Sequence, residues 1–149
     1  MDLTDREISL IRQSFARLKA ENDAVSPFGD AFYARVFAQM PEARSLFRAD
    51  MAGQGMQFLS TLHVLVDHLD DLDRIDRELR TLGEGHAAFG VRPEHYAPMG
   101  EALIETMREA FGETFDAETE TAWRRAYTGL SQRMIAAGLP GEAERVTPP

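Results

Sequence analysis

The feature that most constrains this chain is the recurrence of apolar side chains at helical spacing along almost its whole length. In the first segment, four of them fall on one helical face: Ile8, Ile11, Phe15 and Leu18. Thr4 followed by Glu7 predicts a capping box at the start of that helix. No stretch shows the alternation of apolar and polar residues that is typical of a strand. The sequence therefore predicts an all-α fold.

Proline and glycine breaks divide the rest of the chain into further helical segments. We expect a helix that starts at Pro27, a short piece that starts at Pro41, and then helices over about 54–69, 79–89, 93–111 and 117–137. Gly90 is a natural stop for the fourth of these segments. The last residues show no periodic face. We therefore expect one domain of six to eight helices over 1–138 and a flexible tail over 139–149.

Composition and charge exclude several classes of function. The chain has no cysteine, which excludes disulfides and thiolate metal sites. Its net charge of −9 disfavours binding to nucleic acid or to anionic membranes, because both would repel it. The polar, acidic N-terminus resembles no targeting signal, and no apolar run reaches the roughly 20 residues of a membrane span. We expect a cytoplasmic protein.

One histidine stands out among four. Leu79, Leu82 and His86 follow at i, i+3 and i+7, so the imidazole points with two leucines toward the core. A core histidine either finds hydrogen-bond partners or binds something, and the residues alone leave both options open. Gly83 and Gly85 are unfavourable inside a helix. They indicate either that something approaches closely or that the helix is bent.

The surroundings of this histidine resemble a known family. The run LGEGHAAFGV over 82–91, followed by PEHY over 93–96, resembles the proximal region of bacterial globins and flavohaemoglobins. The FY pair at 32–33 and the run PEARSLF over 41–47 resemble their second helix and the corner behind it. Residues 123–127 are similar to the aromatic start of their last helix. The resemblance covers about 4–136 and implies a globin fold around a haem pocket.

The resemblance implies that His86 is the proximal ligand of a haem b iron, with neutral imidazole donating its lone pair. It also implies a pocket wall of other side chains: Leu82, Phe47, Phe58, Leu62, Val91, Tyr96 and Met99. For each of these residues, ordinary core packing is the alternative interpretation.

On the opposite side of the iron, the resemblance places hydrogen-bond donors. Tyr33 occupies the position of the family's distal tyrosine, and its hydroxyl can donate to a bound ligand. Gln54 is in register with the distal glutamine when the count from His86 has no gaps. Gln57 replaces it if the loop after Phe47 shifts the register. A hydrogen bond worth roughly 1–3 kcal/mol slows oxygen release by about one to two decades.

Two departures from the family pattern bear on function. In flavohaemoglobin-like globins a glutamate of the last helix, together with a tyrosine, hydrogen-bonds the proximal histidine. Tyr96 is present here, but the position of the glutamate falls at Gly138. A flavin- and nicotinamide-binding reductase domain is also missing from these 149 residues. We therefore expect that any electrons come from a separate reductase.

The resulting hypothesis is a haem-binding globin that reversibly binds oxygen, with nitric oxide and carbon monoxide as further ligands. One alternative is a nitric oxide dioxygenase that works with a separate reductase, and another is a gas sensor. All three share one pocket, so the sequence does not separate them. We expect a monomer or a homodimer without nucleic-acid or membrane partners.

Overall fold

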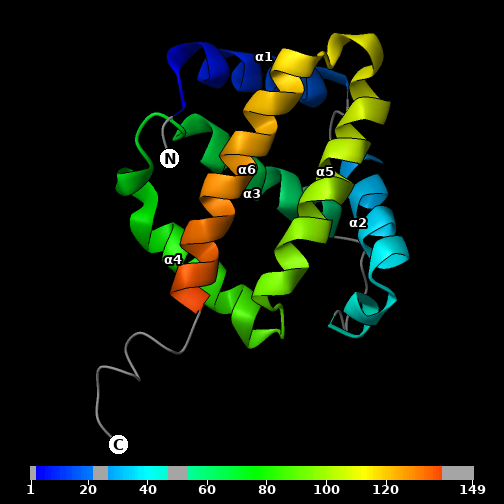
Figure 1. Ribbon diagram of the computed structural model, residues 1–149, viewed down its shortest axis with the longest axis vertical. Coiled ribbons are helices and arrows are strands. Elements are labelled where there is room, and N and C mark those ends of the chain that lie inside the picture. Colours follow the sequence, from blue (N-terminus) through cyan, green and yellow to red (C-terminus); the bar gives the residue numbers. More distant parts are fainter. Residues whose placement is uncertain (1–2, 22–26, 47–53, 139–149) are drawn as a thin grey trace, which may run out of the picture.

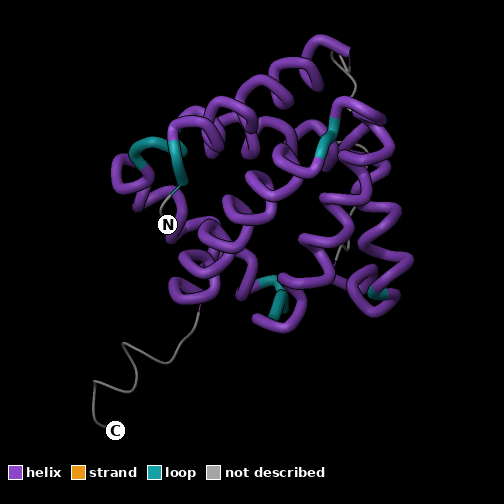
Figure 2. Tube along the Cα trace, turned by 45° about the horizontal axis from the view of Figure 1, so that its top comes forward, coloured by secondary structure: helices purple, strands orange, loops and turns teal. Residues whose placement is uncertain are grey.

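A computed structural model describes residues 3–21, 27–46 and 54–138 of the chain. Within these ranges the protein consists of α-helices, short 3₁₀ turns and loops, with no strand (Figure 2). The α-helices are α1 (Asp5–Glu21), α2 (Pro27–Gln39), α3 (Gln54–Asp67), α4 (Asp76–Ala88), α5 (Tyr96–Phe111) and α6 (Ala117–Gly138). The predicted all-α class is confirmed. No helix in this described part combines the length and apolar character needed to cross a bilayer.

Local side-chain chemistry explains where several helices begin and end. The Glu7 amide donates to the Thr4 hydroxyl at 3.0 Å, and the Thr4 amide donates to the Glu7 carboxylate at 2.9 Å, which confirms the predicted capping box. Gly90 follows α4 with φ of 100°, a conformation that favours glycine. Near Pro93 the prediction was wrong in one detail. A separate 3₁₀ turn covers Pro93–His95, and α5 begins only at Tyr96.

The helices cross in a way that places α6 at the centre of the molecule. In Figure 1, α5 and α6 run side by side in opposite directions, and α1 crosses one end of the pair. Helix α4 packs against the C-terminal part of α6, and α2 packs against α5 and α3. Helix α6 therefore contacts α1, α4 and α5, and it links both ends of the fold.

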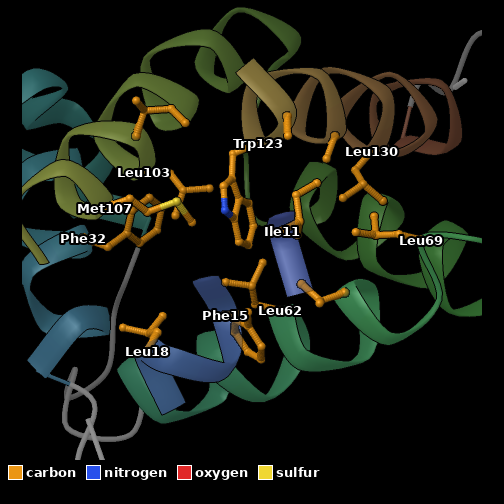
Figure 3. Close-up of a cluster of buried hydrophobic side chains, with 14 of the residues drawn as sticks. Ile11, Phe15, Leu18, Phe32, Leu62, Leu69, Leu103, Met107, Trp123 and Leu130 are labelled. Carbon is orange, nitrogen blue, oxygen red and sulfur yellow. The ribbon is translucent and has the colours of Figure 1, made fainter. Parts of the chain in front are cut away.

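The core is built around one tryptophan. Trp123 projects from α6 into the middle of the cluster, with Leu103 and Ile11 beside it (Figure 3). Its indole Nε1–H donates to the buried Ser14 hydroxyl at 2.8 Å, which satisfies the one polar group of the ring. The Ser14 hydroxyl lies 2.9 Å from the Ile11 carbonyl, to which it donates in turn. Helices α1 and α6 are thus joined by apolar packing and by a buried hydrogen bond.

The two glycines beside His86 occupy different environments. A Cβ atom added at Gly83 would lie 2.8 Å from the Cα atom of Met134 in α6, so this glycine is a point of close helix approach. A Cβ atom added at Gly85 would meet nothing within 4 Å. The prediction of a close approach is confirmed for Gly83, and no described protein atom makes such an approach at Gly85. The approaching group at Gly83 is the backbone of a neighbouring helix.

Candidate functional site

Helix α4 holds the His86 imidazole in a defined orientation. The half-buried ring places its Nδ1 atom 2.8 Å from the carbonyl oxygen of Leu82, one turn earlier in the helix. A carbonyl oxygen only accepts, so Nδ1 carries the proton and donates it. The Nε2 atom of the neutral ring then carries the lone pair. This is the tautomer that a metal-ligating histidine needs when its other nitrogen is held by a backbone carbonyl.

The other three histidines are engaged elsewhere. The ring nitrogens of His63 lie 3.1 Å from the Asp67 carboxylate and 3.4 Å from the Lys19 ammonium group. His95 accepts a hydrogen bond from the Arg92 amide at 2.9 Å, which makes it locally bonded. His68 contacts a carbonyl one turn earlier, as His86 does. The hydrogen bond therefore does not by itself set His86 apart, and its neighbours must be considered.

The neighbour of His86 on α5 is Tyr96. Their ring centroids lie 6.3 Å apart with an interplanar angle of 29°. Tyr96 is buried, and burial raises the pKa of its hydroxyl. The structure therefore brings together two residues that the sequence analysis predicted for the proximal side of a haem pocket.

Tyr127 supports this side of the site, although the sequence analysis assigned it no role. Its hydroxyl donates to the Tyr96 carbonyl at 2.6 Å, and burial raises the pKa of that hydroxyl. Its ring lies against Gly100, where an added Cβ atom would come within 2.5 Å of the ring atom Cε2. A glycine one turn into α5, in a helix otherwise lined with larger residues, was the signal that a bulky group packs there.

Aromatic side chains of α2 and α3 form a second cluster that includes the predicted distal Tyr33 and the predicted wall residue Phe58. The Phe32 and Phe58 rings stack with centroids 4.4 Å apart, and the Tyr33 ring meets Phe58 edge-on at 6.1 Å. Tyr33 is half-buried, and desolvation raises the pKa of its hydroxyl above the ordinary value. The hydroxyl therefore keeps its proton at neutral pH and remains able to donate a hydrogen bond.

The remaining predicted wall residues lie on α3, α4, α5 and the loop after α4. Leu82 and Val91 are half-buried on either side of His86 in the sequence, and Met99 is half-buried on α5. Leu62 of α3 is buried and lines an apolar cavity of about 20 Å³ together with Trp123 and other core residues. Packing within the core is thus a documented role for Leu62.

Of the two predicted distal glutamines, the structure describes the side chain of only one. Gln57 lies on α3 and is exposed. Gln54 is the first residue of α3, but its side chain lies outside the described residues, as does all of Phe47. These two predictions remain predictions.

Gly138 stands where the family resemblance places a glutamate, and the structure leaves little space for a side chain there. A Cβ atom at this position would lie 2.8 Å from the Gly83 carbonyl oxygen and 3.0 Å from the Ala87 Cβ atom. The partner of the His86 Nδ1 atom is a backbone carbonyl instead of a carboxylate.

Comparison with known sequences agrees with this geometry. The family model for globins matches residues 30–134. A flavohemoprotein of Vibrio cholerae is 29% identical over 136 residues, which cover 89% of this chain and 34% of that protein. A flavohemoprotein of Bordetella pertussis is 32% identical over 127 residues, covering 80% of this chain and 32% of that protein. The chain thus spans about a third of the length of these relatives. A neuroglobin of Tetraodon nigroviridis is 30% identical over 140 residues, which cover 85% of this chain and 86% of that protein.

Solved structures share the same arrangement of helices. A bacterial globin of Campylobacter jejuni superposes with a TM-score of 0.80 at 20% identity, covering 91% of this chain and 96% of that one. An engineered carbene transferase, a variant of a candidate nitric oxide dioxygenase from Rhodothermus marinus, superposes with a TM-score of 0.84 at 23% identity, covering 98% and 100%. At these identities the likeness concerns the fold, including the relative placement of α4, α5 and α6.

Proposed function

Because this chain belongs to the globin family, we propose that it holds one haem b through His86 and reversibly binds oxygen. The observation that carries the proposal is that the buried Tyr96 ring lies 6.3 Å, centroid to centroid, from the oriented imidazole of His86. Its Nδ1–H donates to the Leu82 carbonyl at 2.8 Å, which leaves the Nε2 lone pair for iron. Membership of the family implies haem binding. The type of haem, the iron ligand and the choice of gas are part of this proposal.

The residues around the proposed pocket have separate roles. Haem iron supplies a coordination position that takes oxygen, nitric oxide or carbon monoxide. His86 would hold the iron, with Leu82, Val91, Tyr96 and Met99 as apolar walls. The Tyr33 hydroxyl would donate a hydrogen bond to the gas ligand.

Phe58 excludes water beside Tyr33, since its ring packs edge-on against that tyrosine. Leu62 and Phe47 complete the wall in this proposal. Gln54, or Gln57 in the alternative register, supplies a second donor.

The partner of His86 supports binding as the primary role. A carboxylate on the proximal imidazole would raise its basicity and strengthen electron donation to the iron. Here the Nδ1 partner is a neutral carbonyl, and Gly138 leaves no room for an acidic side chain at the position the resemblance suggests. A proximal imidazole whose partner is a neutral carbonyl favours reversible binding over redox chemistry.

A second candidate function is nitric oxide dioxygenase activity with a separate reductase. It is favoured by the structural likeness to the Rhodothermus marinus protein and by the flavohemoprotein relatives, of which this chain spans about a third. The two functions differ in sustained turnover. Nitric oxide consumption that continues for many cycles with an added flavin reductase and NADH would support the enzyme. Consumption that stops after one equivalent would support the binding protein.

Hemin titration of the purified chain tests the proposed function directly. We expect a Soret band that saturates at one hemin per chain. His86→Ala should lose tight hemin retention while keeping its helical circular dichroism, and added imidazole should restore part of the Soret band.

The matched control is His68→Ala, because His68 makes the same contact with a carbonyl one turn earlier but lies in the turn directly after α3. It should bind hemin as the unaltered chain does. A colourless wild-type protein, or full retention by His86→Ala, would overturn the proposal.

A further inference from the structure

Helices α4 and α6 approach each other most closely at two glycines. At Gly83 an added Cβ atom would lie 2.8 Å from the Met134 Cα atom and 2.9 Å from its carbonyl carbon. At Gly138 it would lie 2.8 Å from the Gly83 carbonyl oxygen. Most of the obstructing atoms are backbone, which cannot rotate away as the end of a long side chain can. Only glycine permits so close a crossing at these positions.

These contacts lie beside the turn of α4 that orients the imidazole. Gly83 directly follows Leu82, whose carbonyl accepts the hydrogen bond from His86. The space at Gly138 is bounded by Ala87, which directly follows His86. The α6 backbone therefore supports α4 on both sides of the candidate iron ligand.

Helix α6 also holds the two segments that flank this turn. Arg133 pairs with the Asp73 carboxylate at 3.0 Å, just before α4 begins. On the other side of the imidazole, Tyr127 donates to the carbonyl of Tyr96, the ring of which lies against His86. One helix thus holds the start of α4, the His86 turn and the start of α5.

We propose that Gly83 and Gly138 are positioning residues for His86, and that the closeness of the α4–α6 crossing sets the place of its Nε2 atom. The inference rests on the proposed function, in which Nε2 binds iron. A methyl group at either glycine would push α4 away from α6. Because the Leu82 carbonyl moves with α4, the imidazole would move with it relative to a haem held by the rest of the pocket.

The test compares three alanine variants of the haem-loaded chain. Gly83→Ala and Gly138→Ala carry the obstructed methyl group. Gly85→Ala is the control, because it lies in the same helix and its added Cβ atom would meet nothing within 4 Å. The readouts are the iron–histidine stretching band in the resonance Raman spectrum of the ferrous protein and the rate of hemin transfer to an acceptor apoprotein.

We expect Gly83→Ala to shift the stretching band and to speed hemin loss about 10-fold or more, a typical effect of changing the groups that orient a metal ligand. Gly138→Ala should shift the band in the same direction by a smaller amount, because it lies at the last residue of α6, where the helix end can adjust. Gly85→Ala should leave both readouts unchanged.

Two outcomes would overturn the inference. In the first, folded Gly83→Ala loses thermal stability while its band stays in place, which would make the crossing purely structural. In the second, Gly85→Ala shifts the band as much as Gly83→Ala does. If Gly83→Ala does not fold, Gly138→Ala decides, and an unshifted band there contradicts the proposal. A wild-type chain that binds no hemin would instead overturn the proposed function itself.

Discussion

Tyr33 shows how one residue combines packing with a polar role. The centroid of its ring lies 5.2 Å from that of Phe32 and 6.2 Å from that of Phe37, so the ring is part of the aromatic cluster of α2 and α3. Burial raises the pKa of its hydroxyl, which stays protonated over the physiological range. A protonated hydroxyl can donate a hydrogen bond to a small polar ligand.

We therefore predict that Tyr33→Phe speeds oxygen dissociation by about 10-fold to 100-fold, since the ligand loses a hydrogen bond worth roughly 1–3 kcal/mol. Stopped-flow displacement of oxygen by carbon monoxide measures the rate. Tyr127→Phe is the comparison variant, and we expect it to change the rate less than Tyr33→Phe does. It also removes a tyrosine hydroxyl, but one that donates to the Tyr96 carbonyl. A Tyr33→Phe rate equal to that of the wild type would remove Tyr33 from the ligand site.

The turn between α5 and α6 sets the direction of α6 relative to α5. It therefore determines how Tyr127 of α6 faces Tyr96 of α5. Gly112 ends α5 with φ of 57° and ψ of −131°, a conformation that side chains disfavour. The following helix α6 is capped by the Asp116 carboxylate, which accepts from the Thr119 amide at 2.8 Å. The direction of α6 thus depends on a glycine conformation and on an N-cap.

We predict that Gly112→Ala lowers the free energy of unfolding by about 1–3 kcal/mol, the usual cost of a side chain in a strained backbone conformation. A Cβ atom at this position would meet nothing within 4 Å, so the loss would come from the backbone and not from a clash. Urea denaturation measures it. Gly85→Ala, also in open space but within a helix, should be neutral or stabilising by up to about 1 kcal/mol. Equal effects of the two changes would contradict this account.

Across the whole molecule, arginine–carboxylate pairs join the helices at the surface. Arg124 of α6 contacts Glu101 of α5 at 2.5 Å and Glu120 at 2.9 Å, and Arg108 contacts Glu120 at 2.7 Å. Hydrogen bonds from these guanidinium groups hold the pKa values of Glu101 and Glu120 below their ordinary value. Similar pairs join Arg6 to Glu118 and Arg125 to Glu7, linking α1 to α6.

We predict that the stability of the protein falls in acid, because folding lowers the pKa values of paired carboxylates such as Glu101 and Glu120. A carboxylate whose pKa is lowered by folding binds protons more tightly in the unfolded chain. Its contribution is present above the ordinary pKa and disappears as the pH falls through the folded pKa. The melting temperature should therefore drop as the pH is lowered from 6 to 3.

The variant Glu120→Gln tests this assignment. An exposed ion pair contributes about 1 kcal/mol or less, so the variant should melt about 2–4 °C lower at pH 7. The difference should shrink toward pH 3, where the wild-type carboxylate is protonated as well. Glu113→Gln, at an exposed glutamate in the turn after α5, is the control and should follow the wild-type curve. A difference between Glu120→Gln and wild type that stays constant with pH would contradict the prediction.

Features that depend on neighbours along the chain were predictable from the residues themselves. The capping box of Thr4 and Glu7, the helical class of the fold and the stop at Gly90 each follow from contacts within one turn. The same is true of His86 on the face of Leu79 and Leu82. Local spacing determines which residues share a face of a helix, because the period of an α-helix is constant.

Features that depend on how helices cross were not predictable in the same way. The glycines at 83 and 85 look equivalent in the sequence, yet only Gly83 meets the α6 backbone. The hydrogen bond from Tyr127 to the Tyr96 carbonyl joins two helices across a turn, and the sequence does not indicate which group the Tyr127 hydroxyl meets. Helix packing is set by the fit of whole surfaces, so a one-residue change in position on a helix turns a close contact into open space. The sequence thus determined the helices and the helix face on which His86 lies. The crossing of α4 with α6 decided which groups support that histidine.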